Sequence, residues 1–293
     1  MKGACEDGAM PSAAIPFTKM HGLRNDYVVV DATREAPADP AALARATAER
    51  RAGVGSDGLL LALPSAQADI RMRMFNPDGS EAEMCGNGLR CLALFAVQRG
   101  LVEAGRPLRV ETGAGVLGAR VELGADGRDG RVTVDMGPPE LGGPLALELD
   151  GAVHDFVRVS MGNPHTVCFV EAVDSAPVET LGPRVETHAT FPDRTNVEFV
   201  EVLDRTHVRQ RTWERGAGET LACGTGACAV VVAAVESGHT DRTVHVALRG
   251  GTLEVTWRED GHVEMTGPAV FVFDGQWALA DSPLAASDAG PQA

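Results

Sequence analysis

The hydrophobic pattern of this chain consists of short apolar or alternating runs separated by turns. Residues 17–31 predict two strands joined by a turn at residues 21–26, and residues 40–52 predict a short helix. Residues 70–75 alternate apolar and basic side chains, as a half-buried strand does. The first half of the chain is therefore expected to be mostly β structure. Its further predicted strands are residues 59–63, 108–112, 119–123 and 131–136.

One thirty-residue unit occurs twice. Residues 71–100 align without a gap with residues 209–238, at an offset of 138. Nine of the thirty aligned positions are identical, whereas ordinary composition would give roughly two. The same offset relates Asn25 to Asn163 and Gly58 to Asn196. A fixed offset of this kind indicates two copies of one structural unit.

Each copy of the unit carries a cysteine directly before a predicted helix. Cys85 and Cys223 begin the motif Cys-Gly-x-Gly, and the apolar residues 89–97 and 227–235 follow, interrupted only by Arg90. A helix that is apolar on all sides is buried. Backbone N–H groups and the helix dipole favour anions at its N-terminus, where a thiol pKa can fall to roughly 3.5–7.5. The pair therefore indicates two proton-transfer groups that face one site from opposite sides.

The many short strands and the single buried helix in each copy predict an α/β (α+β) fold. We expect two pseudo-symmetric halves, each a curved, mostly antiparallel sheet or barrel around a buried central helix. Glycine, aspartate and proline are frequent at residues 124–130 and 137–150, so the boundary between the halves is expected there. The predicted division is residues 15–132 and 133–267, with a strand at 268–280 that returns to the first half and loose tails at 1–14 and 281–293.

Composition limits the possible partners. With 293 residues and 44% hydrophobic content, the chain can form a sizeable core. The net charge of −15 and the lack of a basic run make nucleic acid and anionic membranes poor partners. The apolar runs are shorter than the about 18 residues of a membrane span, and residues 1–10 do not resemble a secretory signal. We therefore expect a reduced, cytoplasmic protein that binds a small molecule.

The six cysteines allow other interpretations. Cys85 and Cys223 could be buried structural residues, or could form a disulfide if they face each other across a small site. Cys91 and Cys228 are expected in the helix cores. A zinc site built from all four is weakly supported, because the spacings differ from the short Cys-x-x-Cys knuckle. Residues 224–229 also match the permissive dinucleotide fingerprint, but no hydrophobic strand precedes them.

Five stretches of the chain resemble diaminopimelate epimerase. They are FTKMHGLRND at residues 17–26, NPDGSEAEMCGNGLRC at 76–91, MGNPH at 161–165, RTNVE at 194–198 and ERGAGETLACGTG at 214–226. The resemblance implies an isomerase without cofactor or metal that interconverts LL- and meso-2,6-diaminopimelate in bacterial lysine biosynthesis. It also implies a homodimer whose active site lies in the cleft between the two halves of each chain.

The resemblance also implies roles for the residues that match the family motifs by position. Cys85 and Cys223 would be the acid–base pair, and His165 and Glu214 would tune the proton transfer. Residues at the N-termini of the two helices would hold the substrate carboxylate: Gly86, Asn87, Gly224 and Thr225. The other substrate-binding residues would be Asn25, Asn76, Asn163, Asn196, Glu214 and Arg215.

Two residues depart from the family pattern. Arg24 occupies a position where the family usually has glycine, and an arginine there costs stability if the turn needs a positive φ. Gly58 occupies a position where many members have a glutamine that contacts the substrate.

Two other functions stay open. One is another cofactor-free amino-acid racemase with the same cysteine pair, and the other is a nucleotide-binding module that uses the Gly-x-Gly turns.

Overall fold

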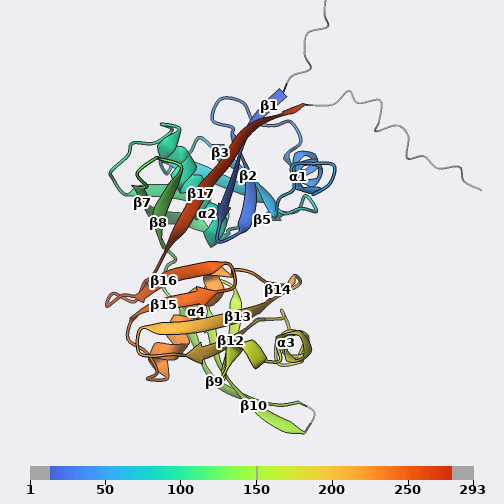
Figure 1. Cartoon of the computed structure of the whole chain (residues 1–293), viewed down its shortest axis with the longest axis vertical. Coiled ribbons are helices and arrows are strands. Elements are labelled where there is room, and N and C mark those ends of the chain that lie inside the picture. Colours follow the sequence, from blue (N-terminus) through green and yellow to red (C-terminus); the bar gives the residue numbers. More distant parts are fainter. Residues whose placement is uncertain (1–13, 150, 279–293) are drawn as a thin grey trace, which may run out of the picture.

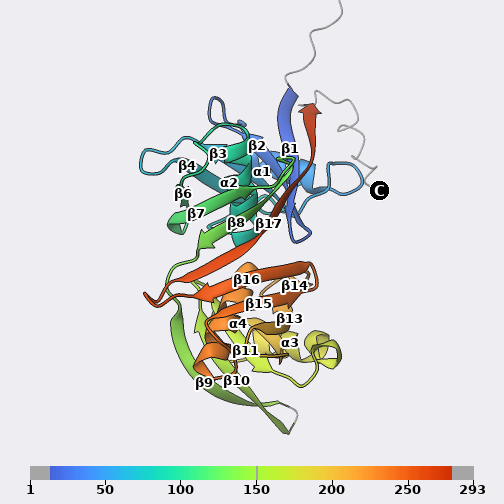
Figure 2. The ribbon, with the colours of Figure 1, turned by 60° about the vertical axis from the view of Figure 1, so that its left-hand side comes forward.

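The computed structural model describes residues 14–149 and 151–278. The chain folds into two halves that lie end to end along its longest axis (Figure 1, Figure 2). The first half contains β1 (Ala14–Gly22), β2 (Asn25–Asp31), α1 (Pro40–Ala48), β3 (Gly58–Leu63), β4 (Ile70–Phe75), β5 (Glu81–Ala82), α2 (Gly86–Gln98), β6 (Leu108–Thr112), β7 (Gly115–Leu123) and β8 (Asp129–Asp135). The second half contains β9 (Glu140–Leu149), β10 (Ala152–Ser160), β11 (Pro164–Phe169), the 3-10 helix η1 (Val173–Ser175), α3 (Val178–Glu186), β12 (Asn196–Val202), β13 (His207–Glu214), β14 (Gly218–Thr220), α4 (Gly224–Glu236), β15 (Thr243–Leu248) and β16 (Gly251–Trp257).

A buried helix lies at the centre of each half. All residues of α2 from Gly86 to Val97 are buried, and most of α4 is buried as well. Their leucine, valine and alanine side chains point to all sides, so the surrounding strands pack against the whole helix surface. Each such Leu or Val stabilises the fold by about 1.5–3 kcal/mol. A glycine with positive φ follows each helix, Gly100 at 68° and Gly238 at 72°. The predicted fold class is confirmed.

The strand register repeats in the same way as the sequence. β2 and β3 are parallel with Tyr27 opposite Gly58, and β11 and β12 are parallel with His165 opposite Asn196. Both pairs are related by the offset of 138 residues, and α1 and α3 begin at the same offset. The two halves are therefore equivalent in backbone structure as well as in sequence.

One long strand connects the halves. β17 (Val263–Ala278) begins next to β16, with Val263 opposite Trp257. It then pairs antiparallel with β8 and with β1 of the first half. Figure 1 shows it as the red strand that crosses from one half to the other. Side chains of β17 therefore contribute to the core between the two halves.

The structure contains two elements that the sequence analysis does not predict, and it corrects the end of one predicted helix. The predicted boundary segment at residues 137–150 contains strand β9, which pairs with β10 across a β-bulge at Gly142. The sequence analysis does not predict α3, whose few apolar residues and internal Pro183 give a weak helical signal. The helix predicted at residues 40–52 ends at Ala48. The expected tails lie outside the described residues except for Ala14, and the division into domains stays a prediction.

Candidate active site

The two cysteines of the repeated unit occupy equivalent places at neighbouring helix ends. Cys85 is the N-cap residue of α2, and Cys223 is the N-cap residue of α4. In the first turn of α2, Asn87 Nδ2 donates a hydrogen bond to the carbonyl oxygen of Ala222 at 3.1 Å. Because Ala222 directly precedes Cys223, this bond ties the two helix N-termini together across the boundary between the halves.

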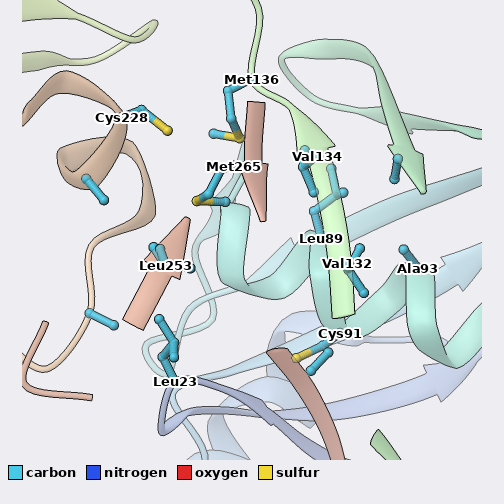
Figure 3. Packing of buried hydrophobic residues seen from close by; sticks show 14 of the residues in the cluster. Leu23, Leu89, Cys91, Ala93, Val132, Val134, Met136, Cys228, Leu253 and Met265 are labelled. Atoms are coloured by element: carbon cyan, nitrogen blue, oxygen red, sulfur yellow. The ribbon is translucent and has the colours of Figure 1, made fainter. Parts of the chain in front are cut away.

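Met265 of β17 lies between the two helix ends (Figure 3). A Cβ atom added to Gly86 would be 2.8 Å from Met265 Cε, and one added to Gly224 would be 3.1 Å from Met265 Sδ. A side chain at either position would therefore require Met265 to move. Glycine at both positions allows the free N–H groups of the two helices to approach one common space, where they favour an anion.

Cys85 lies in a chain of hydrogen bonds that begins at a buried arginine. Arg90 donates to Asn87 Oδ1 at 2.9 Å, and Asn87 Nδ2 donates to Asn25 Oδ1 at 3.1 Å. The hydroxyl group of Tyr27 also donates to Asn25 Oδ1, and its oxygen lies 3.1 Å from the Cys85 Sγ. Three residues that the sequence assigns to the site, Asn25, Cys85 and Asn87, are thus brought together.

Cys223 has a different set of partners. Its Sγ accepts a hydrogen bond from the backbone N–H of Gly226 at 3.3 Å and lies 3.6 Å from Thr225 Oγ1. Asn163 Nδ2 donates to Thr225 Oγ1 at 3.3 Å, and His165 Nε2 lies 3.1 Å from Asn163 Oδ1. The structure therefore groups four residues of the sequence-predicted site around the second helix N-terminus.

A buried contact between an imidazole and a carboxylate supports this second group. His165 Nδ1 lies 2.7 Å from Glu198 Oε1, and both side chains are fully buried. A Cβ atom added to Gly226 would lie 2.8 Å from the same Glu198 oxygen. The carboxylate therefore packs directly against the turn that holds Cys223.

The electrostatic environment of Cys223 favours the protonated thiol. Burial raises the pKa of Cys223 well above its ordinary value, and the carboxylates of Glu214 and Glu198 raise it further. Burial also raises the pKa of Glu214. The hydrogen bonds from Thr225 and from the Gly226 N–H lower the pKa of Cys223, but burial and the two nearby carboxylates outweigh them.

Two further predicted site residues, Asn196 and Arg215, meet in a turn beside the second group. Asn196 Nδ2 donates to the Pro164 carbonyl, and the Arg215 N–H donates to Asn196 Oδ1, each at 2.9 Å. The Arg215 side chain is exposed and donates to the Asp193 carbonyl. Asn76 donates to Ser80 Oγ within its own turn. These bonds hold Asn76 to its own turn and not to the other site residues.

Comparison with known proteins identifies the family. The family model described as diaminopimelate epimerase matches residues 17–142 and 157–272. This chain belongs to the diaminopimelate epimerase family. Among its relatives, a diaminopimelate epimerase of Moorella thermoacetica is 53% identical over 278 residues, which cover 90% of this chain and 99% of the relative. Another, of Desulforudis audaxviator, is 54% identical over 279 residues, with 90% and 99% covered.

Solved structures share the fold at low sequence identity. A phenazine biosynthesis protein of the PhzF family from Bacillus anthracis has a TM-score of 0.70 and 21% identity, covering 90% of this chain and 99% of that chain. A probable proline racemase from Agrobacterium radiobacter K84 has a TM-score of 0.71 and 18% identity, covering 92% and 95%. The fold of the diaminopimelate epimerase family is therefore also found in proteins of other names.

The structure describes both departures from the pattern of diaminopimelate epimerases. Arg24 has a φ of 66° and the preceding Leu23 a φ of 56°, so both adopt the left-handed conformation that costs a side-chain-bearing residue stability. A Cβ atom at Gly58 would lie 2.8 Å from the Phe75 carbonyl oxygen. A longer side chain would therefore require the backbone to move at that position.

The cysteine alternatives can be compared with the described residues. The five cysteines in the described part of the chain are unpaired. Within residues 14–149 and 151–278, no group of three or more His, Cys, Asp or Glu side chains gathers as a metal site. Cys91 and Cys228 lie in the core, where burial raises the pKa of each to about 12. Across the same described ranges, no helix has the length and apolar character needed to cross a membrane.

Sequence reasoning missed three residues of the site. Tyr27 contacts Cys85, while Glu198 and Gln210 lie behind Cys223. A signal for Tyr27 was available, because the offset of 138 aligns it with His165. Glu198 lies within a family motif, but its sequence neighbours do not reveal that it reaches the cysteine turn.

Proposed function

We propose that this protein is a diaminopimelate epimerase that inverts one α-carbon of 2,6-diaminopimelate with Cys85 and Cys223 as its acid–base pair. The observation that carries the proposal is the convergence of two equivalent cysteine-capped helices, tied together by the bond from Asn87 to the Ala222 carbonyl. Membership of the diaminopimelate epimerase family supports the choice of substrate.

Inversion at an α-carbon requires a base on one face and an acid on the other. One cysteine, as a thiolate, takes the α-proton, so a C–H bond breaks and an S–H bond forms. The other cysteine, as a thiol, gives its proton to the opposite face of the planar carbanion. The protons balance, and the two sulfurs exchange protonation states. The reverse reaction starts from the exchanged state, so neither direction needs a redox step.

The helix N-termini supply the stabilisation that the carbanion needs. When the α-proton leaves, negative charge spreads onto the neighbouring carboxylate. The N–H groups at Gly86, Asn87, Gly224 and Thr225 would bind this carboxylate and interact more strongly as its charge grows. Interactions that strengthen in the transition state raise kcat rather than only lowering KM. Cys223 is 6% exposed, so little water competes with these donors.

The amide and charged side chains would bind the rest of the substrate. Asn25 and Asn163 lie beside the two helix N-termini. Asn196 and Arg215 lie on the adjoining turn, and the exposed Arg215 side chain would bind the distal carboxylate. Asn76 would complete this set. His165 and Glu214 would tune the proton transfer through their charges near Cys223. A monocarboxylate racemase would not require Arg215, so Arg215→Ala should raise KM for diaminopimelate several-fold.

The decisive experiment follows solvent deuterium at the α-carbon with LL-diaminopimelate as the substrate. The wild type should incorporate deuterium and form the meso isomer, whereas Cys85→Ala and Cys223→Ala should lose epimerisation. Cys168→Ala is the matched control, because Cys168 is a buried cysteine in a separate core cluster. Full epimerisation by either site variant would refute the cysteine pair. A substrate panel with proline and glutamate tests the alternative racemases, and a thermal-shift assay with dinucleotides tests the nucleotide-binding alternative.

The family resemblance also supports a cytoplasmic homodimer that needs no cofactor. Light scattering of the purified protein tests the dimer directly. Activity after exhaustive dialysis against a chelator, with unchanged turnover as the expected result, tests independence from metal ions.

A further inference from the structure

Tyr27 lies beside Cys85 without a role in the proposed reaction. Its hydroxyl oxygen is 3.1 Å from the Cys85 Sγ, and the same hydroxyl donates to Asn25 Oδ1. The residue is only 1% exposed, so water does not compete for the hydroxyl group. A phenol has one proton, yet two acceptors surround it here. The question is which acceptor receives the proton.

Tyr27 is the structural counterpart of His165. The offset of 138 relates the two residues, and each occupies the same register position on equivalent parallel strands. Each also forms a hydrogen bond to the side-chain oxygen of the asparagine two residues earlier, Asn25 or Asn163. The second half therefore places an imidazole where the first half places a phenol.

Charged neighbours fix the orientation of the amides around Tyr27. Asn25 Nδ2 donates to the Asp57 carboxylate at 2.8 Å, so the oxygen of Asn25 faces Tyr27. Arg90 donates to Asn87 Oδ1, so the Asn87 amino group faces Asn25 at 3.1 Å. Neither amide can flip without losing a charged partner. The oxygen of Asn25 thus always has a donor from Asn87, with or without Tyr27.

We propose that Tyr27 is a positioning residue whose hydroxyl group changes its hydrogen-bond acceptor with the protonation state of Cys85. The inference rests on the proposed function, because Cys85 must gain and lose a proton in each turnover. When Cys85 is a thiol, its S–H donates to the phenol oxygen and Tyr27 donates to Asn25. When Cys85 is a thiolate, the sulfur can only accept, and Tyr27 donates to it. Asn25 then keeps the bond from Asn87, so the hydrogen-bonding groups of these side chains are paired in both states.

The other groups that face the pair agree with this assignment. Burial raises the pKa of Tyr27 well above its ordinary value, and the neighbouring Cys85, Cys91 and Asp57 add to the rise. The phenol therefore keeps its proton and acts by reorienting. Arg90, which approaches from α2, interacts favourably with a negative charge on Cys85. A hydrogen bond to a charged acceptor is about twice as strong as a neutral one, so the turned hydroxyl favours the thiolate.

Tyr27→Phe tests the inference because it removes only the hydroxyl group. Iodoacetamide labelling of the substrate-free protein, followed by mass spectrometry of the peptides, reports each cysteine separately without turnover. At about pH 7, the labelling rate of Cys85, taken relative to its high-pH plateau, should be about tenfold lower in Tyr27→Phe than in the wild type. The profile of Cys223 should not change. Thr47→Val is the matched control, because it removes a buried hydroxyl in α1 that bonds only to backbone carbonyls.

A second measurement avoids any loss of packing. The chain holds a single tyrosine, so expression with fluorotyrosine labels this site alone. Fluorine makes the phenol a stronger donor, so the acidic limb of the kcat/KM profile should move to lower pH, while Tyr27→Phe moves it to higher pH. Unchanged labelling of Cys85 in folded Tyr27→Phe would overturn the inference. So would a fall in the labelling rate of Cys223 or of Thr47→Val that equals the fall at Cys85. Loss of the cysteine-pair mechanism would appear separately, as epimerisation by Cys85→Ala.

Discussion

Gly226 separates the Cys223 sulfur from a buried carboxylate, and substitution by alanine should disable catalysis more than folding. The added methyl carbon would lie 2.8 Å from Glu198 Oε1 and 3.1 Å from both Cys223 Sγ and Gln210 Nε2. Carbon contacts are optimal at about 3.5–4.0 Å, so these neighbours must move by about 0.5 Å or more. Glu198 is held by His165 at 2.7 Å and has no solvent into which it can move.

The two consequences of Gly226→Ala differ in size. Overpacking costs about 1–3 kcal/mol, and alanine recovers about 0.5–1 kcal/mol of this in a helix. The net loss of stability should therefore stay below about 2.5 kcal/mol. A displacement of about 1 Å at a reacting group can lower the rate about 100-fold. We expect a folded protein whose kcat for epimerisation falls about 10- to 100-fold.

The equivalent glycine of the first half provides the control. A Cβ atom at Gly88 would lie 3.1 Å from Leu60 Cδ2 and 3.6 Å from Cys85 Cβ. The nearer neighbour is the flexible end of an apolar side chain, so Gly88→Ala should retain most of the activity. Turnover by deuterium exchange and thermal melting should be measured for both variants. The reasoning fails if Gly226→Ala keeps near-normal turnover, or if both variants lose activity equally.

Three further predictions concern stability. Arg24→Gly should raise the free energy of unfolding by about 0.5–1 kcal/mol in thermal melts, because Arg24 has a φ of 66°; a loss of stability would contradict this. Glu219→Gln should lower the free energy of unfolding by about 3 kcal/mol in urea unfolding, because the Glu219 side chain is only 7% exposed. The equivalent Glu81→Gln should lower it by less than about 1 kcal/mol, because the Glu81 side chain is 45% exposed. Equal losses would refute the argument. The stability from the thiols of Cys91 and Cys228 should be fully present below their unfolded pKa of about 8.5 and be lost as the pH rises towards their folded pKa of about 12. In that window, each thiol should lower the free energy of unfolding by about 1.4 kcal/mol per pH unit. Cys91→Ala and Cys228→Ala should each reduce this slope in urea unfolding under reducing conditions.

The sequence predicts the parts of the fold that have regular apolar periodicity. α2 and α4 are predicted because their residues are apolar on all sides and end before a glycine. β9 is not predicted, because Gly142, Gly143 and Pro144 resemble a linker. In the structure, Gly142 is the extra residue of a β-bulge and Gly143 has a φ of 71°. These residues shape a bent strand instead of ending it.

The site shows a different limit of sequence reasoning. The positions of Cys85 and Cys223 relative to the helices follow from the repeated motif itself. The partners of the two sulfurs do not, because Tyr27 and Glu198 reach them from separate strands through tertiary packing. The offset of 138 residues could have drawn attention to Tyr27 as the counterpart of His165. The carboxylate of Glu198 has no such signal, since its counterpart in the first half is a leucine.

The duplicated halves carry different buried ionisable residues behind their equivalent backbones. Arg90 is fully buried on α2, and its counterpart on α4 is Cys228. Glu198 is fully buried on β12, and its counterpart on β3 is Leu60. Neither residue is needed to repeat the backbone, because the other half folds in the same way without it. Burying an ionisable group costs stability, so these two residues require another explanation.

A catalyst with two identical acid–base groups provides that explanation. Such an enzyme is active only when one sulfur carries a proton and the other does not, because two thiols lack a base and two thiolates lack an acid. A symmetric site would give both cysteines the same proton affinity, and much of the protein would then be in an inactive state. Arg90 lies near Cys85, whereas burial and the carboxylates of Glu214 and Glu198 raise the pKa of Cys223. The two equivalent sulfurs therefore have different electrostatic surroundings, and such a difference is what a catalyst that needs one thiol and one thiolate at a time would use.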